Sequence, residues 1–491
     1  MLCHPQATKS KEIRHRVKCT TTSLMNLLLL LLLLLLSLLI PNGTSISAAD
    51  NYQITVQVPE EFCPGFVGRA FLLETNGTAL PHFKAALSVE SSSITLNGRY
   101  TCSLDVFIGD VRVWSSGHFS PFYASDRCYL ELTDGGDLRL KQGPFGQVGW
   151  RSGTNGQGVQ RLELLPSGNL VLLDEKRNIK WQSFNFPTNT MLREQRLNMA
   201  TRLTTPFSKN SSSTYSFEIQ FGKLALYLNS NKSKYSYWEY KPPHGKNISF
   251  IQLSRNGLEL FDQNFKKFIQ LWSSGSEDLS YMSLSNRTGN LGLYHYSLKS
   301  ANFEASFEVL NETCELPLAC KPYGVCTFSS SCSCIRLKRR ASNSDCSYEN
   351  EAFEGELCDV KRYEMLELDG VESLFTFEPN KVNVTKEECS NLCLSDCKCR
   401  GVFYSVGECF LYGMIRGIRQ VEARKGRSYL IKLMKGDRRP NGSFLGLKKW
   451  ALILIGVVDA LILAMVFGGF GYYLIRKRQK NSIRTDARTR N

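Results

Sequence analysis

The segment Leu162-Glu-Leu-Leu-Pro-Ser-Gly168-Asn-Leu-Val-Leu172 repeats the pattern of Leu130-Glu-Leu-Thr-Asp-Gly-Gly136-Asp-Leu-Arg-Leu140, which lies 32 residues earlier. In both copies, leucines alternate with other residues on either side of a turn that contains glycine. Alternation with a period of two places one face of a strand in a core. Each copy therefore predicts a β-hairpin with one buried face.

Looser copies of this pattern occur about 120 residues further along the chain, and they are offset from each other by 31 residues. Their positions are Ile251, Leu253, Gly257 and Leu260 in one copy, and Met282, Leu284, Gly289, Leu291 and Leu293 in the other. Two similar pairs at such a distance indicate a duplicated all-β domain.

Residues 1–49 have the composition of a secretory leader. The basic segment Lys9–Lys18 precedes a leucine-rich core, Leu27–Ile40, and small residues come just before Asp50. This order is typical of a cleaved signal peptide. Met25 is an alternative start, and an uncleaved anchor helix is the alternative to cleavage.

A second apolar run, Trp450–Ile475, is long enough to cross a bilayer, for which about 20 residues suffice. A juxtamembrane segment, 434–449, precedes it, and a short basic tail, 476–491, follows it. Basic flanks favour the cytoplasmic side, although Lys448 and Lys449 weaken the asymmetry. Together with the leader, this predicts a single-pass type I protein of the plasma membrane with an extracellular N-terminus.

The formal net charge of +15 is concentrated at the two ends of the chain. The leader carries +4 and the tail +6, which leaves +5 for residues 50–475. The overall basicity therefore does not predict nucleic-acid binding. The tail's charge is suited to anionic lipid head groups or to a plain stop-transfer flank.

Fifteen of the 17 cysteines lie between the leader and the apolar run, which indicates an oxidising compartment. Three of them, Cys63, Cys102 and Cys128, form an odd set, so we expect one buried free thiol or a bridge to another chain. N-glycosylation sequons in this region begin at Asn76, Asn210, Asn231, Asn247, Asn286, Asn311, Asn383 and Asn441.

The stretch Asn169–Asp174, followed by Trp181-Gln-Ser-Phe-Asn-Phe-Pro-Thr-Asn-Thr-Met-Leu192, resembles the bulb-type lectin domain of the plant S-locus-like, or G-type, receptors. The resemblance implies a lectin domain over 50–186 and a second, divergent one over 187–310. Its implied fold is a tandem β-prism, each with three four-stranded sheets around a shared core. The expected class is mainly β.

Six cysteines crowd into 33 residues of the segment 311–350: Cys314, Cys320, Cys326, Cys332, Cys334 and Cys346. So short a segment needs disulfides because it cannot build an apolar core. It resembles an EGF-like module, which implies the pairs Cys314–Cys326, Cys320–Cys332 and Cys334–Cys346. A zinc cluster is the metal alternative, but it fits poorly in an oxidising compartment, and we expect no calcium or other cofactor.

Residues 353–433 contain a further set of cysteines: Cys358, Cys389, Cys393, Cys397, Cys399 and Cys409. The spacing of Cys389, Cys393 and Cys397 predicts one face of a helix. The run Cys389–Cys399 and the segments Gly401–Tyr404, Cys409–Tyr412 and Tyr429–Lys432 resemble a plant PAN/apple domain. The resemblance implies a module that binds proteins or sugars.

In bulb-type lectins, a strand with the pattern Gln-x-Asp-x-Asn-x-Val-x-Tyr holds mannose. The corresponding positions here keep Asn169 and Val171 in one copy and Asn290 and Tyr294 in another, where a glycan on Asn286 would cover the strand. The first repeat keeps none of the five motif residues, and Asp137 stands in place of the asparagine. Each unpaired sugar hydroxyl costs about 1–3 kcal/mol, so we expect these degenerate sites not to bind mannose.

Small residues four apart form a stripe along the apolar run: Gly456, Ala460, Ala464 and Gly468. Such stripes let helices approach closely. The neighbouring Asp459 is costly inside a bilayer, so it predicts contact with protein, unless it lies near enough to the interface to reach water. We expect lateral pairing, either with a second copy or with a receptor kinase.

Enzyme functions are not expected, because no nucleotide-binding or kinase motif is visible. The domain order resembles that of the S-locus-like receptor kinases, but this chain departs from them where their kinase would begin. The first hypothesis is a kinase-less receptor-like protein that recognises an extracellular protein, peptide or glycan and acts through a membrane partner. The second is a membrane-tethered lectin of mannose-type specificity.

Overall fold

The computed structural model is mainly β and divides into two units. Unit 1 comprises residues 1–319 with 373–381, and unit 2 comprises residues 320–372 with 382–491. The structure describes these residues: 45–47, 52–76, 81–91, 99–206, 213–230, 233–272, 278–335, 346, 360–375, 381–422, 426–435, 457–458, 460–474 and 476.

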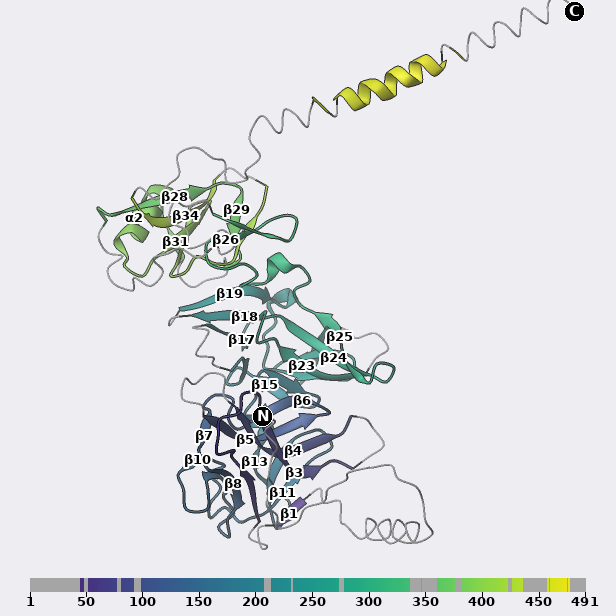
Figure 1. The fold of residues 1–491 in the computed structure, drawn as a ribbon, viewed down its shortest axis with the longest axis vertical. Coiled ribbons are helices and arrows are strands. Elements are labelled where there is room, and N and C mark those ends of the chain that lie inside the picture. Colours follow the sequence, from purple (N-terminus) through teal and green to yellow (C-terminus); the bar gives the residue numbers. More distant parts are fainter. Residues whose placement is uncertain are drawn as a thin grey trace, which may run out of the picture. The chain divides into compact units, whose positions relative to one another are not determined.

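The first half of unit 1 consists of three antiparallel sheets, which we call the first sheet triad (Figure 1). Their orders are β1-β11-β12-β13, β10-β9-β8-β2 and β3-β4-β5-β6, with β7 paired to β5. The strands are β1 (Ser45–Ser47), β2 (Gln53–Gln57), β3 (Val67–Glu74), β4 (Phe83–Ser91), β5 (Tyr100–Ile108), β6 (Val111–Ser115), β7 (Phe122–Ala124), β8 (Arg127–Leu132), β9 (Leu138–Gln142), β10 (Val148–Arg151), β11 (Val159–Leu164), β12 (Leu170–Asp174) and β13 (Ile179–Gln182).

The second half repeats this plan in the second sheet triad, in which β17, β18 and β19 lie side by side, as do β23, β24 and β25 (Figure 1). Its sheet orders are β14-β23-β24-β25, β15-β20-β21-β22 and β16-β17-β18-β19. The strands are β14 (Thr190–Leu192), β15 (Arg196–Asn198), β16 (Arg202–Thr204), β17 (Ser213–Gln220), β18 (Lys223–Ser230), β19 (Ser233–Tyr240), β20 (Phe250–Leu253), β21 (Leu258–Phe261), β22 (Lys267–Leu271), β23 (Leu279–Leu284), β24 (Leu291–Ser297) and β25 (Asn302–Glu308). Short 3-10 turns lie at Ser183–Asn185, Pro243–Gly245 and Thr313–Glu315.

The hairpins predicted from the leucine repeat are present. Leu130 faces Leu140 across β8 and β9, and Leu162 faces Leu172 across β11 and β12. All four leucines are at most 1% exposed and belong to one core cluster, because alternate side chains of a strand point to the same face. The turn of the second hairpin needs glycine, since Gly168 has φ +81° and an added Cβ would lie 2.4 Å from the ring of Phe83.

Among its described residues, unit 2 contains two sheets, the helix α2 (Lys386–Ser395) and a further helical stretch at 457–458 and 460–474. The sheet orders are β27-β26-β33-β29 and β28-β34-β31-β32-β30. The strands are β26 (Gly324–Cys326), β27 (Cys332–Cys334), β28 (Tyr363–Leu368), β29 (Val371–Ser373), β30 (Lys381–Asn383), β31 (Gly401–Ser405), β32 (Glu408–Tyr412), β33 (Ile418–Gln420) and β34 (Arg427–Met434). Because β26 pairs in parallel with β33, the predicted EGF-like and PAN/apple segments share one sheet.

Disulfides hold the cysteine-rich segments of unit 2. Cys320–Cys332 and Cys334–Cys346 are bonded, as the resemblance to EGF-like modules implied. The pair Cys314–Cys326 stays a prediction, although both cysteines are disulfide-bonded. Cys358 lies outside the described residues.

Two disulfides attach α2 to its neighbours: Cys389–Cys409 joins it to β32, and Cys393–Cys399 joins it to the following loop. The prediction that Cys397 shares their helical face is wrong. The helix ends at Ser395, so Cys397 lies beyond it, exposed and disulfide-bonded.

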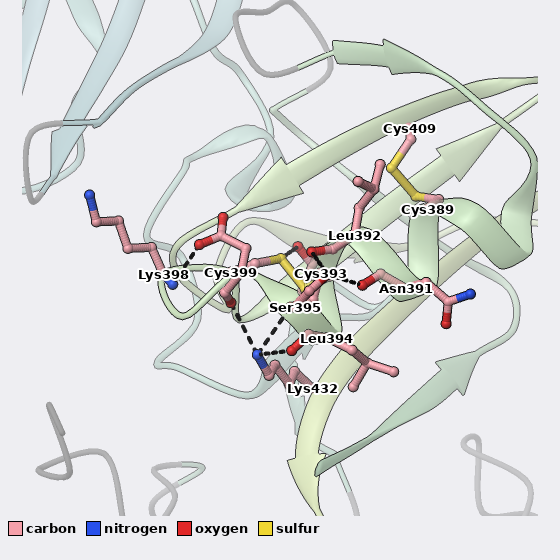
Figure 2. The surroundings of a disulfide bond; sticks show 12 residues. Cys389, Asn391, Leu392, Cys393, Leu394, Ser395, Lys398, Cys399, Cys409 and Lys432 are labelled. Atoms are coloured by element: carbon pink, nitrogen blue, oxygen red, sulfur yellow. Dashed lines mark hydrogen bonds between the residues drawn. A yellow bond between two sulfur atoms is a disulfide. The ribbon is translucent and has the colours of Figure 1, made fainter. Parts of the chain in front are cut away.

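A buried lysine caps the end of α2 (Figure 2). The ammonium group of Lys432, on β34, donates to the carbonyl oxygens of Cys393, Leu394 and Asp396, each at 3.0 Å. The last carbonyl groups of a helix have no partner within the helix, and a cation also opposes the negative end of the helix dipole. Burial lowers the pKa of Lys432, and the charge of Asp396 partly opposes that shift.

The expectation of a free thiol in the first sheet triad is also wrong. Cys102 on β5 and Cys128 on β8 form a disulfide between two of the three sheets. Cys63 is disulfide-bonded as well.

The apolar run 450–475 is described only in part. Residues 457–458 and 460–474 are helical, whereas Gly456 and Asp459 lie outside the described residues. Over the described part of the chain, no helix combines the length and apolar character required to cross a membrane.

Candidate functional site

Three tryptophans mark the centre of the first sheet triad. Trp114, Trp150 and Trp181 sit opposite Val106, Leu140 and Leu172, respectively, at the equivalent place in each sheet. A register shift beside each pair bends the strand there. The rings meet edge to face with centroids 5.6–6.2 Å apart, a favourable aromatic geometry. The three sheets therefore converge on one aromatic cluster.

The second sheet triad keeps the positions but changes the residues. The pairs there are Leu226 with Trp238, Leu260 with Ile269 and Leu293 with Phe307, and each again has a register shift beside it. An additional tryptophan, Trp272, stacks on Phe307 and packs against Trp238 with centroids 5.6 and 5.7 Å apart.

The asparagine kept from the mannose pattern in the first triad is occupied inside the protein. Asn169 is 5% exposed, and its side-chain N–H donates to Gln182 at 2.8 Å. Its oxygen accepts hydrogen bonds from the hydroxyl of Ser183 and the backbone N–H of Phe184, both at 3.2 Å. Asn169 therefore ties the start of β12 to the segment after β13, and a sugar hydroxyl would have to displace these bonds.

The asparagine kept in the second triad has the same role. Asn290 is 6% exposed, donates to the carbonyl of Leu310 at 2.8 Å and accepts from the N–H of Leu310 at 2.9 Å. Its oxygen also accepts from the N–H of Leu291 at 3.0 Å. This side chain thus holds the end of the triad against the start of β24.

Asp137 holds the equivalent place in the first repeat. Its Oδ1 accepts from Ser152 and from the N–H groups of Gly153 and Thr154, and its Oδ2 accepts from Arg139 at 2.9 Å. Burial alone would raise the pKa of Asp137, but these hydrogen bonds outweigh it and hold the pKa below its usual value. Asp137, Asn169 and Asn290 form one set, which we call the latch residues.

The remaining motif positions do not restore a sugar site either. Val171 is fully buried, and Tyr294 is half-buried, with its ring stacked on Tyr281 at 4.9 Å. Leu165 and Ser167, at the positions of the motif's Gln and Asp, line a cavity of about 550 Å³ and bring one hydroxyl to it. The structure thus places the kept motif residues on or directly before β12 and β24, and it engages the polar atoms of Asn169 and Asn290 inside the protein.

The other predicted residues have varied outcomes. Five sequon asparagines are described and exposed: Asn76, Asn247, Asn286, Asn311 and Asn383. Asn210, Asn231 and Asn441 lie outside the described residues. Ala460, Ala464 and Gly468 are exposed on the described helix, and their role in helix pairing stays a prediction. Within the described ranges, no group of three or more His, Cys, Asp or Glu side chains could hold a metal ion.

The sequence reasoning missed Trp150 and the latch set as a unit. A signal for Trp150 exists, since it precedes Trp181 by 31 residues, close to the offset of the leucine repeat. The latch function has no such signal, because its hydrogen-bond partners come from other strands.

Comparison with known proteins supports the resemblance. A family model described as D-mannose binding lectin matches residues 112–214. A PAN domain-containing protein of Arabidopsis thaliana is 26% identical over 68% of this chain and 70% of its own length. A G-type lectin S-receptor-like serine/threonine-protein kinase of the same plant is 26% identical over 72% of this chain.

The chain spans 44% of the length of that kinase, and it spans 71% of EP1-like glycoprotein 3 of Arabidopsis thaliana, to which it is 25% identical. The matched lectin model covers the tryptophan positions of the first triad, and two of the relatives are named for a PAN domain and for a G-type lectin, respectively. The chain therefore contains a bulb-type lectin domain, and over most of its length it is similar to plant G-type lectin S-receptor-like proteins and to a PAN domain-containing protein.

Proposed function

We propose that this chain is a non-enzymatic cell-surface receptor-like protein that recognises an extracellular protein or peptide, and that its lectin domains have lost mannose binding. The observation that carries the proposal is the internal engagement of Asn169 and Asn290. Releasing either one leaves several buried polar groups unpaired, at about 1–3 kcal/mol for each group. A monosaccharide site that incurs this cost and lacks the motif's Gln and Asp would bind mannose too weakly for recognition by a receptor.

The architecture we propose is a leader, two β-prism lectin domains (the first ending at 186, the second 187–310), an EGF-like module (311–350) and a PAN/apple domain (353–433). The two sheet triads and the two disulfides of the EGF-like segment support it. The predicted end of the leader at residue 49 is not kept, because β1 (Ser45–Ser47) pairs with β11 in the first triad. We further propose type I membrane anchoring through 450–475, which the exposed apolar side chains of the helix at 460–474 support, since water does not favour such a surface.

A glycan array tests the recognition proposal. The chain, produced in a eukaryotic secretory host, should bind no mannose-terminated glycan above background. The matched variant Leu165→Gln/Ser167→Asp/Leu173→Tyr restores the motif on the same strand and reports whether the fold can present it. Wild-type binding that free mannose competes away would overturn the proposal and favour the second hypothesis, a tethered mannose lectin, which the description of the matching family model favours.

The membrane partner is tested separately. Ala460→Leu with Ala464→Leu should abolish proximity to a second copy or to a receptor kinase in intact cells, because the small-residue stripe would be filled. Val458→Leu with Val466→Leu adds bulk to the opposite helix face and should leave proximity unchanged. Equal effects of the two pairs would contradict pairing through the stripe.

A further inference from the structure

A cavity of about 390 Å³ opens beside the tryptophan cluster of the first sheet triad. Trp114, Trp150 and Trp181 form its inner wall, and Phe119 and Phe186 flank it with 60% and 51% of their surfaces exposed. Phe186 stacks on Trp181, with centroids 5.9 Å apart at an angle of 18°. The cavity therefore offers aromatic faces and edges to a flat apolar group, at a place separate from the strands of the mannose pattern.

Apart from its serine hydroxyls, which can donate or accept, the polar side chains of this cavity are hydrogen-bond donors. Within the part of the chain that the structure describes, Arg151 has no ion-pair partner, and no acceptor meets the indole N–H of Trp150 or Trp181. Neither indole nitrogen is among the buried polar atoms without a partner, so solvent reaches both. A guanidinium and two indole N–H groups can satisfy an anion but cannot pair with one another.

Among the described residues that line the cavity, none carries a carboxylate to neutralise this set. Asp137 accepts a hydrogen bond from the lining residue Ser152, but Asp137 is itself 1% exposed and ion-paired with Arg139 at 2.9 Å. Arg151 thus lines the cavity with an exposed guanidinium, and no described carboxylate forms an ion pair with it. An exposed guanidinium beside aromatic walls suits a bound carboxylate on an aromatic body.

We propose that this cavity binds an aromatic carboxylate, with the ring against the tryptophan and phenylalanine faces and the carboxylate on Arg151. The same chemistry is present in a free small aromatic acid and in the C-terminal residue of a peptide that ends in an aromatic side chain. The proposal for this cavity and the proposed receptor function rest on different residues, so either can fail without the other.

Calorimetry on the full chain tests this with 2-naphthoate and its neutral analogue, 2-naphthamide. A ligand of this size in an open aromatic pocket should bind with a Kd on the order of a millimolar. The amide should bind about tenfold more weakly, because it cannot form a charge-assisted pair with the guanidinium. Equal binding of the two, or no binding of the acid at several times that concentration, would overturn the proposal.

Variants assign the contacts. Arg151→Gln should weaken the acid about tenfold and leave the amide unchanged, whereas Phe186→Ala should weaken both. Arg255→Gln and Phe145→Ala, at exposed positions outside the cavity lining, are the matched controls and should change neither. Loss of acid binding in the controls but not in Arg151→Gln would remove the site from this cavity.

Further ligands separate the alternatives. Octanoate binding as tight as that of 2-naphthoate would overturn the aromatic contact, and displacement by mannose would make the cavity a sugar subsite and also overturn the proposal. The peptide Ala-Ala-Ala-Phe with a free C-terminus, compared with its C-terminal amide, identifies the source: binding of the free peptide supports a peptide terminus, and binding of 2-naphthoate alone supports a small acid.

Discussion

The two sheet triads of unit 1 share a plan but are held together differently. In both, three sheets meet at one position per sheet beside a register shift, and a buried latch residue ties strands together. The first triad fills its centre with three tryptophans and adds the Cys102–Cys128 disulfide. The second has no cysteine in 187–310 and fills its centre with Trp238, Ile269, Trp272 and Phe307. The two triads thus share their strand pairing and register shifts, although the side chains at their centres differ.

The largest expected effect separates the two centres. Trp181→Ala removes a ring that is 7% exposed and packs against three others, so the first triad should lose about 3–5 kcal/mol of stability. Trp238→Ala, at a half-buried position, should cost the second triad about half as much. Hydrogen exchange followed by mass spectrometry on peptides from each triad measures both losses. Equal loss of protection in both triads after either change would mean that they unfold as one unit.

Removal of the disulfide should affect the first triad alone. The bond closes a loop with a sequence separation of 26, so Cys102→Ala with Cys128→Ala should cost about 3 kcal/mol, chiefly by enlarging the unfolded ensemble. The second triad serves as the internal control, since it has no cysteine to lose. The same exchange experiment would contradict this difference if β17 to β19 lost protection to the same degree as β5 and β8.

The latch residues differ in what surrounds them, and this explains their identities. Asp137 meets only donors, so a carboxylate suits it. The amide of Asn290 must donate to the carbonyl of Leu310, which cannot become a donor. The amide of Asn169 donates to the side chain of Gln182, which can rotate to present its own N–H.

Asn290→Asp should therefore cost about 2 kcal/mol, because it sets a carboxylate against a carbonyl, whereas Asn169→Asp should cost about 1 kcal/mol or less. Chemical denaturation followed by exchange in each triad measures the difference. The alanine variants at both positions are controls and should cost similar amounts. A larger loss at 169 than at 290 would contradict the explanation from surroundings.

The sequence predicts the leucine-repeat hairpins of both triads, because these depend on local features. The alternation of leucines around Gly168 and the 32-residue offset suffice for the hairpins, and the lectin resemblance follows from Trp181–Leu192. The fate of Asn169 could not be predicted, since Gln182 and Ser183 become its neighbours only through the pairing of β12 with β13. The pattern that predicts a sugar site cannot distinguish a side chain aimed outward from one bonded inward.

The cysteines likewise separate what local spacing predicts from what depends on contacts between distant parts of the chain. Spacing predicts that Cys389 and Cys393 share a helix face, and both are buried on α2. The spacing rule fails at Cys397, because the helix ends two residues earlier, at Ser395. The spacing of cysteines does not indicate where a helix ends. Pairing across strands, as between Cys102 and Cys128, depends on which sheets become neighbours.

The smallest expected effect is a difference in acid sensitivity between the triads. The pKa of Asp137 is lowered in the folded chain, so its ionised form stabilises the fold above the unfolded pKa, and this contribution is lost as the pH falls through the folded pKa. Burial raises the pKa of Asp105 in the same triad, so that group acts in the opposite sense: its contribution is present at low pH and is lost as the pH rises through its folded pKa. The latch of the second triad, Asn290, does not titrate.

Asp137→Asn should therefore remove part of the acid-induced loss in the first triad and leave the second unchanged, whereas Asp105→Asn should keep at neutral pH the stability that the wild type gains only in acid. Denaturation midpoints between pH 6 and pH 3, followed by exchange in each triad, measure both. Asp137→Asn also removes a carboxylate acceptor of Arg139, so the denaturation midpoint of this variant at pH 6 should lie below that of the wild type. The test is therefore how steeply the midpoint changes with pH, not its value at pH 6. An unchanged slope in Asp137→Asn would mean that the hydrogen bonds to this carboxylate do not favour its ionised form over its protonated one.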